Sequence, residues 1–138
     1  MKRLIYPENL ADHVTAFFTG KDPGADRSSI GRILGLPPEK IYLPIQKHTD
    51  KILVVGPSPE PAIADAVITA ERGILLGVQV ADCVPILLYE TRKKVVGAVH
   101  AGWRGTAAGI LKKTVNLICQ RFYGNAADIF VAIGPSIR

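Results

Sequence analysis

Two apolar runs, VPILLYE (84–90) and KVVGAVH (94–100), flank the short polar turn TRKK and constrain the fold more than any other feature. Two further apolar runs precede them, AVIT (66–69) and GILLGVQV (73–80). Strands that are apolar almost throughout are typical of a sheet buried on both faces. The pattern therefore predicts a central sheet rather than a helical bundle.

Helical signals are interspersed with these runs. Asp26 is placed to cap a helix through RSSIGRIL, which Gly35 and Pro37 would stop. The segment 105–124 is the best helix, with Gly124 as its stop and apolar residues at helical spacing: Ile110, Leu111, Val115, Ile118 and Phe122. Strands are also predicted at HVTAFFT (13–19) and DIFVAIG (128–134), and two further apolar runs are IYLPI (41–45) and KILVV (51–55). We predict an α/β sandwich with a mixed sheet, covered by at least the long helix.

Composition narrows the class of protein. Apolar residues make up 48% of the chain and charged residues 21%, which excludes a disordered chain. No apolar run reaches the ~20 residues of a membrane span, and MKRLIYPENLADH does not have the pattern of a secretory signal, so the expected compartment is the cytoplasm. The net charge of +5 comes from scattered lysines and arginines, which argues against nucleic acid as a partner and suits an anionic small substrate.

The chemistry begins at Cys83 and His100. If 84–90 and 94–100 form an antiparallel hairpin, Glu90 faces Val95 and Pro85 faces His100. Cys83 then lies beside His100 at one end of the hairpin. The two cysteines of the chain do not make a disulfide framework, and in the cytoplasm they are free thiols, metal ligands or nucleophiles.

A catalytic zinc ion usually has three protein ligands, so a third partner is needed. The candidates are His13, His48, Asp65 and Asp82, of which His48 in QKHTD is the best placed, at the end of a strand. We interpret His13 as ordinary surface and Cys119 as a packing residue on the apolar side of the helix. Asp82 can instead hydrogen-bond to a side chain that binds the metal and so orient that side chain.

The motif HAGWRGT follows the second strand of the hairpin. Gly102 and Gly105 allow close approach of the backbone to a ligand, or a positive φ. The segment leads into the predicted long helix, whose N-terminal end suits an anion, and Arg104 adds donors for phosphate or carboxylate, or else forms a structural salt bridge. Trp103 either stacks on a base or packs in the core.

Five motifs in this order, QKHTD, DAVIT, ADCVP, HAGWRGT and IGPSI, resemble those of the multicopper polyphenol oxidase or laccase-domain family, now regarded as purine nucleoside phosphorylases. The resemblance covers roughly residues 41–137. It implies an α/β sandwich like that of cysteine hydrolases, and a zinc ion held by His48, Cys83 and His100. It also implies phosphorolysis of adenosine, inosine, guanosine and methylthioadenosine, and deamination of adenosine, with Cys83, His100 and Arg104 taking part in catalysis.

The chain departs from the family pattern at both ends. Thr19 stands in the place of a Thr-x-Arg-x-Gly-Gly-like stretch, but Lys21 occupies the position expected for arginine. The family also continues well beyond IGPSI. We therefore expect residues 1–138 to form a single laccase-domain-like domain shortened at its C-terminus, with a sheet edge that is free to drive self-association.

Three other functions stay open at this point. Cys83 and His100 can act as the nucleophile and base of a metal-free hydrolase or deamidase. Copper can displace zinc at the same ligands and oxidise phenols, although three histidines cannot build a multicopper relay. The third function is that of a non-enzymatic binding module that holds a structural metal. His48 separates the first of these from the zinc enzyme, because a Cys-His dyad does not need it.

Overall fold

A computed structural model describes residues 4–7 and 14–136, and the chain divides into two compact units, residues 1–41 and 42–138. In the first unit, β1 (Leu4–Ile5) pairs antiparallel with β2 (Phe18–Thr19), and α1 (Arg27–Leu34) is followed by the 3-10 turn η1 (Pro38–Lys40). The strand predicted over 13–19 is shorter than expected, and His13 lies outside the described residues.

The helix predicted from Asp26 to Gly35 is confirmed. Asp26 occupies the N-cap position of α1 with extended backbone, and its carboxylate accepts a 2.6 Å hydrogen bond from the Ser29 hydroxyl. That bond is the main reason why the pKa of Asp26 lies below its usual value. Gly35 ends the helix at φ 68°, in the left-handed region that glycine adopts without steric cost.

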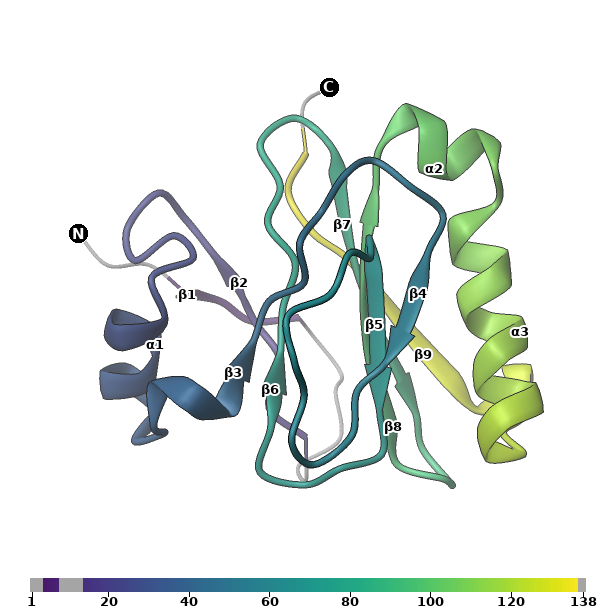
Figure 1. The fold of residues 1–138 in the computed structure, drawn as a ribbon, viewed down its shortest axis with the longest axis horizontal. Helices are drawn as coiled ribbons and strands as arrows, with labels where there is room; N and C mark the ends of the chain where they lie inside the picture. Colours follow the sequence, from purple (N-terminus) through teal and green to yellow (C-terminus); the bar gives the residue numbers. More distant parts are fainter. Residues whose placement is uncertain (1–3, 8–13, 137–138) are drawn as a thin grey trace. The chain divides into compact units, whose positions relative to one another are not determined.

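The second unit is built on a mixed five-stranded sheet (Figure 1). Its strand order is β4-β5-β8-β7-β9, and only β4 and β5 run parallel. The bounds are β4 (Ile52–Val54), β5 (Ala66–Thr69), β7 (Val84–Glu90), β8 (Val95–Ala101) and β9 (Ile129–Ile133). A separate pair joins β3 (Ile41–Tyr42) to β6 (Leu75–Leu76), so most of the predicted run 73–80 is loop.

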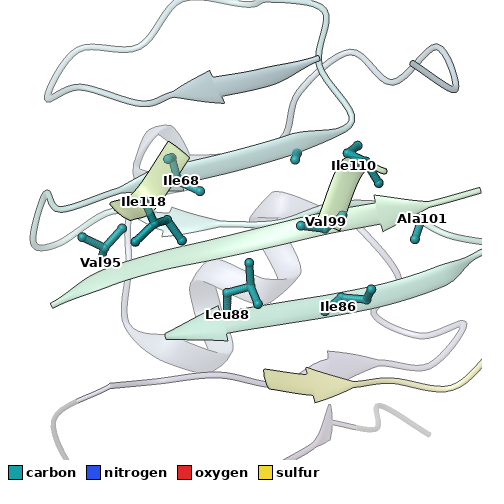
Figure 2. Close-up of a cluster of buried hydrophobic side chains, with 9 residues drawn as sticks. Ile68, Ile86, Leu88, Val95, Val99, Ala101, Ile110 and Ile118 are labelled. Atoms are coloured by element: carbon teal, nitrogen blue, oxygen red, sulfur yellow. The ribbon is translucent and has the colours of Figure 1, made fainter. Parts of the chain in front are cut away.

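Both faces of this sheet are covered, as the apolar strands predict. Helix α3 (Ile110–Phe122) lies along one face, where Ile110 and Ile118 point at side chains of β5, β7 and β8 (Figure 2). On the opposite face Val67 and Ala98 pack with Tyr42 and Val55. Apolar side chains of the central strands are therefore buried on both faces of the sheet.

The β7–β8 hairpin has the predicted register: Glu90 pairs with Val95 and Pro85 with His100. An unpredicted feature stabilises its turn. The Glu90 side chain is fully buried, and its Oε1 accepts a 2.7 Å hydrogen bond from the Arg92 N–H and a longer one from that of Lys93. Gly124 packs against the same carboxylate, since a Cβ at that position would lie 2.8 Å from Oε2.

The helix predicted over 105–124 is wrong in one respect. The structure breaks it into α2 (Trp103–Ala107) and α3, separated by Gly109 at φ 75°. Gly109 is the N-cap of α3, and Tyr123 rather than Gly124 is its left-handed C-cap. The motif HAGWRGT therefore enters a five-residue helix and not the long one. Within the described ranges, no helix combines the length and apolar character that a membrane span requires.

Strand β9 is an outer strand of the five-stranded sheet. Phe130, Val131 and Ile133 are about half exposed or more, although they are large and apolar. Edge strands of this kind are templates for pairing with another chain. Self-association through β9 stays a prediction.

The contribution of the buried Glu90 carboxylate to the stability of the turn can be tested by substitution. In Glu90→Gln the side chain keeps its size but loses the charge that the turn N–H groups solvate, so unfolding should become easier by roughly 1–3 kcal/mol. Urea denaturation measures this change, with Glu60→Gln on an exposed side chain as the control. Equal stability of the two variants would contradict a structural role for Glu90.

Candidate metal centre

Three side chains from separate segments meet at one end of the five-stranded sheet. His48 lies in the loop between β3 and β4, Cys83 directly precedes β7, and His100 lies near the end of β8. One possible ligand atom from each lies within 4.8 Å of the others. The rings of His48 and His100 are arranged edge to face, with centroids 5.0 Å apart. The set is therefore close enough to bind one small ion.

The hairpin explains why Cys83 and His100 are neighbours. Since Pro85 pairs with His100 and Val84 with Ala101, the residue before β7 lies at the same end of the sheet as the end of β8. His100 is buried, with 4% of its surface exposed, whereas Cys83 is half-buried and has a free thiol. His48 is exposed. The cluster is thus anchored in the sheet on one side and open on the other.

Asp65 lies behind the two histidines and is fully buried. Its carboxylate accepts a hydrogen bond from His100 Nδ1 at 2.7 Å and others from the backbone N–H groups of Lys47, His48 and Thr49. Burial raises the pKa of this carboxyl, but the Thr49 N–H, His100 and the Thr49 hydroxyl together outweigh it and hold the pKa below its usual value. Sequence reasoning weighed Asp65 only as a ligand, and the structure engages its carboxylate elsewhere.

The loop that carries His48 has an unusual backbone. His48 has φ 58°, which is in the left-handed region that side chains other than glycine rarely adopt. A second contact ties this loop to the segment before Cys83. The Gln46 side chain donates to the Gln79 carbonyl at 2.6 Å and accepts from the Gln79 N–H at 2.7 Å. The loop is therefore held at two points, by the Asp65 carboxylate and by the Gln46–Gln79 pair, and these contacts maintain the strained backbone of His48.

Both glycines of HAGWRG lie close to other atoms of the protein, and their approach to a ligand stays a prediction. A Cβ on Gly102 would lie 3.2 Å from His48 Nδ1 and 3.4 Å from Cys83 Sγ. A Cβ on Gly105 would lie 3.2 Å from the Thr49 carbonyl oxygen. Gly102 has φ −79°, so it needs space rather than a special backbone conformation. Without a Cβ, Gly102 leaves open the space between His48, Cys83 and His100.

Trp103 and Arg104 extend from the cluster into solvent. Trp103 is 76% exposed and so does not pack in the core, and the Arg104 guanidinium stacks on its ring, 5.2 Å from the centroid. Within residues 4–7 and 14–136, Arg104 forms no ion pair, so a structural salt bridge does not hold it. The expectation that this motif leads directly into the long helix is wrong, because α2 comes first. Binding of an anion by Arg104 stays a prediction.

The other predicted residues lie apart from the cluster or at its margin. Asp82 is exposed and next to Cys83 in the chain, and in the described part of the structure its side chain makes no hydrogen bond or ion pair. Cys119 is half-buried on α3 with a free thiol. Thr19 belongs to the first unit, where its hydroxyl donates to the Gly24 carbonyl.

The donor set fits a metal of the zinc type. Two imidazoles and one thiolate are ligands that zinc accepts, and three protein ligands leave one position of a tetrahedral ion open. Because Asp65 occupies His100 Nδ1, the ring offers Nε2 to the ion. Fold and site together define an α/β protein in which His48, Cys83 and His100 form a candidate metal centre at one end of a mixed sheet.

Comparisons with known proteins extend this description. The pattern of the family described as multi-copper polyphenol oxidoreductase laccase matches residues 15–138, so the chain belongs to that family. It is 46% identical over 101 residues to a purine nucleoside phosphorylase of Aquifex aeolicus, covering 72% of this chain and 47% of that protein. It is 35% identical over 122 residues to adenosine deaminase RL5 of an unknown prokaryotic organism, covering 80% and 46%.

The fold of this chain is also similar to that of a solved structure. The Bacillus licheniformis protein YfiH superposes with a TM-score of 0.77 at 32% identity, covering 80% of this chain and 45% of that one. The chain spans about half the length of the curated relatives it matches. The mixed α/β fold and the family predicted from sequence are both confirmed.

The space beside Gly102 gives a test of the centre. In Gly102→Ala the added methyl group would crowd His48 and Cys83, and we expect Co²⁺ binding to weaken by about ten-fold or more. A titration followed by the visible absorption of Co²⁺ measures this affinity. Gly56→Ala is the matched control, because a Cβ there meets no atom within 4 Å. Equal affinity in the two variants would contradict the placement of the ion.

Proposed function

We propose that this chain carries the metal centre of a purine nucleoside enzyme, in which His48, Cys83 and His100 hold a zinc ion. The observation that carries the proposal is the approach of three ligand atoms from three separate segments to within 4.8 Å. A bound zinc ion supplies a Lewis acid that polarises a water molecule or a substrate oxygen. The names of the relatives, purine nucleoside phosphorylase and adenosine deaminase, support the substrate class.

The proposed reactions are phosphorolysis of adenosine, inosine, guanosine and methylthioadenosine, and deamination of adenosine. In phosphorolysis a phosphate oxygen attacks ribose C1′ and the purine leaves. Arg104 has the planar set of donors that binds phosphate in two places, and it lies four residues after His100. The exposed ring of Trp103 offers a face on which a purine can stack. Asp82, exposed beside Cys83, is proposed to contact substrate.

The proposal separates into two parts that are tested in turn. All three ligands and Asp65 belong to the unit of residues 42–138, so binding of the metal needs only residues of this chain. The matched part of the chain covers 47% and 46% of the two relatives, and the turnover of nucleosides is proposed on their names and on the family resemblance. Metal binding is therefore measured first.

We expect protein purified without added metal to contain about one zinc ion per chain, and His48→Ala and Cys83→Ser to contain almost none. Elemental analysis by mass spectrometry measures this content. Cys119→Ser is the matched control for Cys83→Ser, since it removes the same kind of side chain from α3, outside the cluster. Parent protein with zinc is then assayed with adenosine and inosine, with and without phosphate.

One observation favours a second function. Asp65, His100 and Cys83 have the order of a carboxylate, a base and a nucleophile, in which the acid orients the imidazole. A folded parent without metal, whose Cys83 reacts rapidly with a thiol probe, would support this metal-free hydrolase in place of the zinc enzyme. His48→Ala would then retain full activity.

Copper chemistry is expected only after exchange of the metal. Cu²⁺ binds nitrogen and sulfur ligands more tightly than Zn²⁺ does, so the same three residues would accept it. We predict that zinc-only protein does not oxidise phenols and that oxidation begins only on addition of copper. Oxygen consumption with a phenolic substrate measures the reaction, and Cys83→Ser is its control. Oxidation by protein shown to contain only zinc would overturn this assignment.

A further inference from the structure

A single buried carboxylate touches both histidines of the metal centre. Asp65 Oδ2 accepts a hydrogen bond from His100 Nδ1 at 2.7 Å and another from the His48 backbone N–H at 3.1 Å. Its Oδ1 accepts three more, from the Lys47 N–H at 3.2 Å and from the N–H and hydroxyl of Thr49, both at 2.8 Å. Asp65 is 0% exposed, so water does not compete for these oxygens.

The contact with His100 fixes the position of a proton. A carboxylate oxygen can only accept, so Nδ1 must carry the hydrogen. In the neutral ring the lone pair then belongs to Nε2, which is the atom left to bind a metal. The backbone of His100 is also held, because its N–H donates to the Asp65 carbonyl at 2.7 Å.

The contact with the other histidine is made through the backbone. Three successive N–H groups, those of residues 47 to 49, converge on the Asp65 carboxylate. This convergence holds the loop in the shape that gives His48 its φ of 58°. Asp65 therefore holds the backbone from which the His48 side chain extends.

We propose that Asp65 is the positioning residue of the centre: it selects the Nδ1–H tautomer of His100 and at the same time fixes the loop that presents His48. The part of this proposal that concerns metal affinity rests on the proposed function. The part that concerns the tautomer does not, because the same proton position would serve His100 as a base toward Cys83.

Asp65→Asn is the direct test. The amide nitrogen would face either the two donors now bound to Oδ2 or the three now bound to Oδ1. His100 can relieve the clash at Oδ2 by moving its proton from Nδ1 to Nε2, which removes the lone pair that a metal needs. We expect Co²⁺ affinity to fall by about ten- to a hundred-fold.

Two readouts are used on the full chain. Titration with Co²⁺, followed by the thiolate-to-cobalt and ligand-field absorption bands, gives the affinity. Nitrogen-15 NMR of the imidazoles in metal-free protein gives the tautomer of His100, which we expect to be Nδ1–H in the parent and Nε2–H in Asp65→Asn. A purely structural role would lower stability without changing the tautomer.

A second variant covers the case in which Asp65→Asn does not fold. Thr49→Val removes one donor to Asp65 and keeps the carboxylate, so Co²⁺ affinity should fall several-fold, by less than in Asp65→Asn. Thr114→Val makes the same change in a buried threonine whose hydroxyl donates to the Ile110 carbonyl of α3, and its affinity should equal that of the parent.

The outcomes separate the two proposals. A parent that binds no Co²⁺ but shows the Nδ1–H tautomer would overturn the zinc centre and support the role of Asp65. A parent that binds Co²⁺, with Asp65→Asn and Thr49→Val equal to it in affinity and tautomer, would overturn the role of Asp65 and leave the centre intact.

Discussion

The hydrogen bonds of Asp65 connect the sheet to the metal centre, and the remaining features of the site depend on them. Its backbone N–H donates to the Lys51 carbonyl and its carbonyl accepts from the His100 N–H, so the residue is held where β4, β5 and β8 meet. Its carboxylate then reaches back to the loop of residues 47 to 49. Burying an ionised carboxylate is costly unless donors surround it, and here the site supplies them. The hydrogen bonds of Asp65 therefore stabilise both the correct pairing of the strands and the correct shape of the loop.

The sequence predicted those parts of the fold that depend on local patterns. The β7–β8 hairpin could be registered because two unbroken strands flank a short turn, which leaves few ways to pair them. The helix 27–34 could be placed because Asp26 and Gly35 mark its two ends. The apolar runs 13–19 and 73–80 predict longer strands than the structure has, because apolar content indicates burial and not hydrogen bonding to a neighbouring strand.

The sequence could not predict features that depend on contacts between distant residues. Gly109 in a helical pattern reads as a tolerated glycine, and only its left-handed backbone shows that it separates α2 from α3. Glu90 reads as a polar strand end, yet the structure buries it against its own turn and Gly124. The same holds for Asp65, whose five donors come from residues 16 or more positions away, and for Gln46, whose partner is Gln79. QKHTD and HAGWRG gave the ligand candidates but not what holds them in place.

The break at Gly109 changes how the site would bind its substrate. Because the five-residue α2 precedes it, the N-terminal end of the long helix does not directly follow His100, and Arg104 is the group proposed to bind phosphate. The guanidinium stacks on the exposed Trp103 ring and is free of ion pairs within the described residues. A cation and an aromatic face thus extend together from the open side of the cluster, an arrangement with the two properties that a nucleoside and phosphate require.

The central claim is that His48, Cys83 and His100 bind one zinc ion together. X-ray absorption at the zinc edge of protein purified without added metal tests this most directly, because it reports the ligand atoms themselves. Binding by these three residues should give one sulfur ligand at about 2.3 Å and two nitrogen ligands at about 2.0–2.1 Å, with a lighter atom in the fourth position. A zinc ion surrounded only by oxygen and nitrogen, with no sulfur, would contradict it.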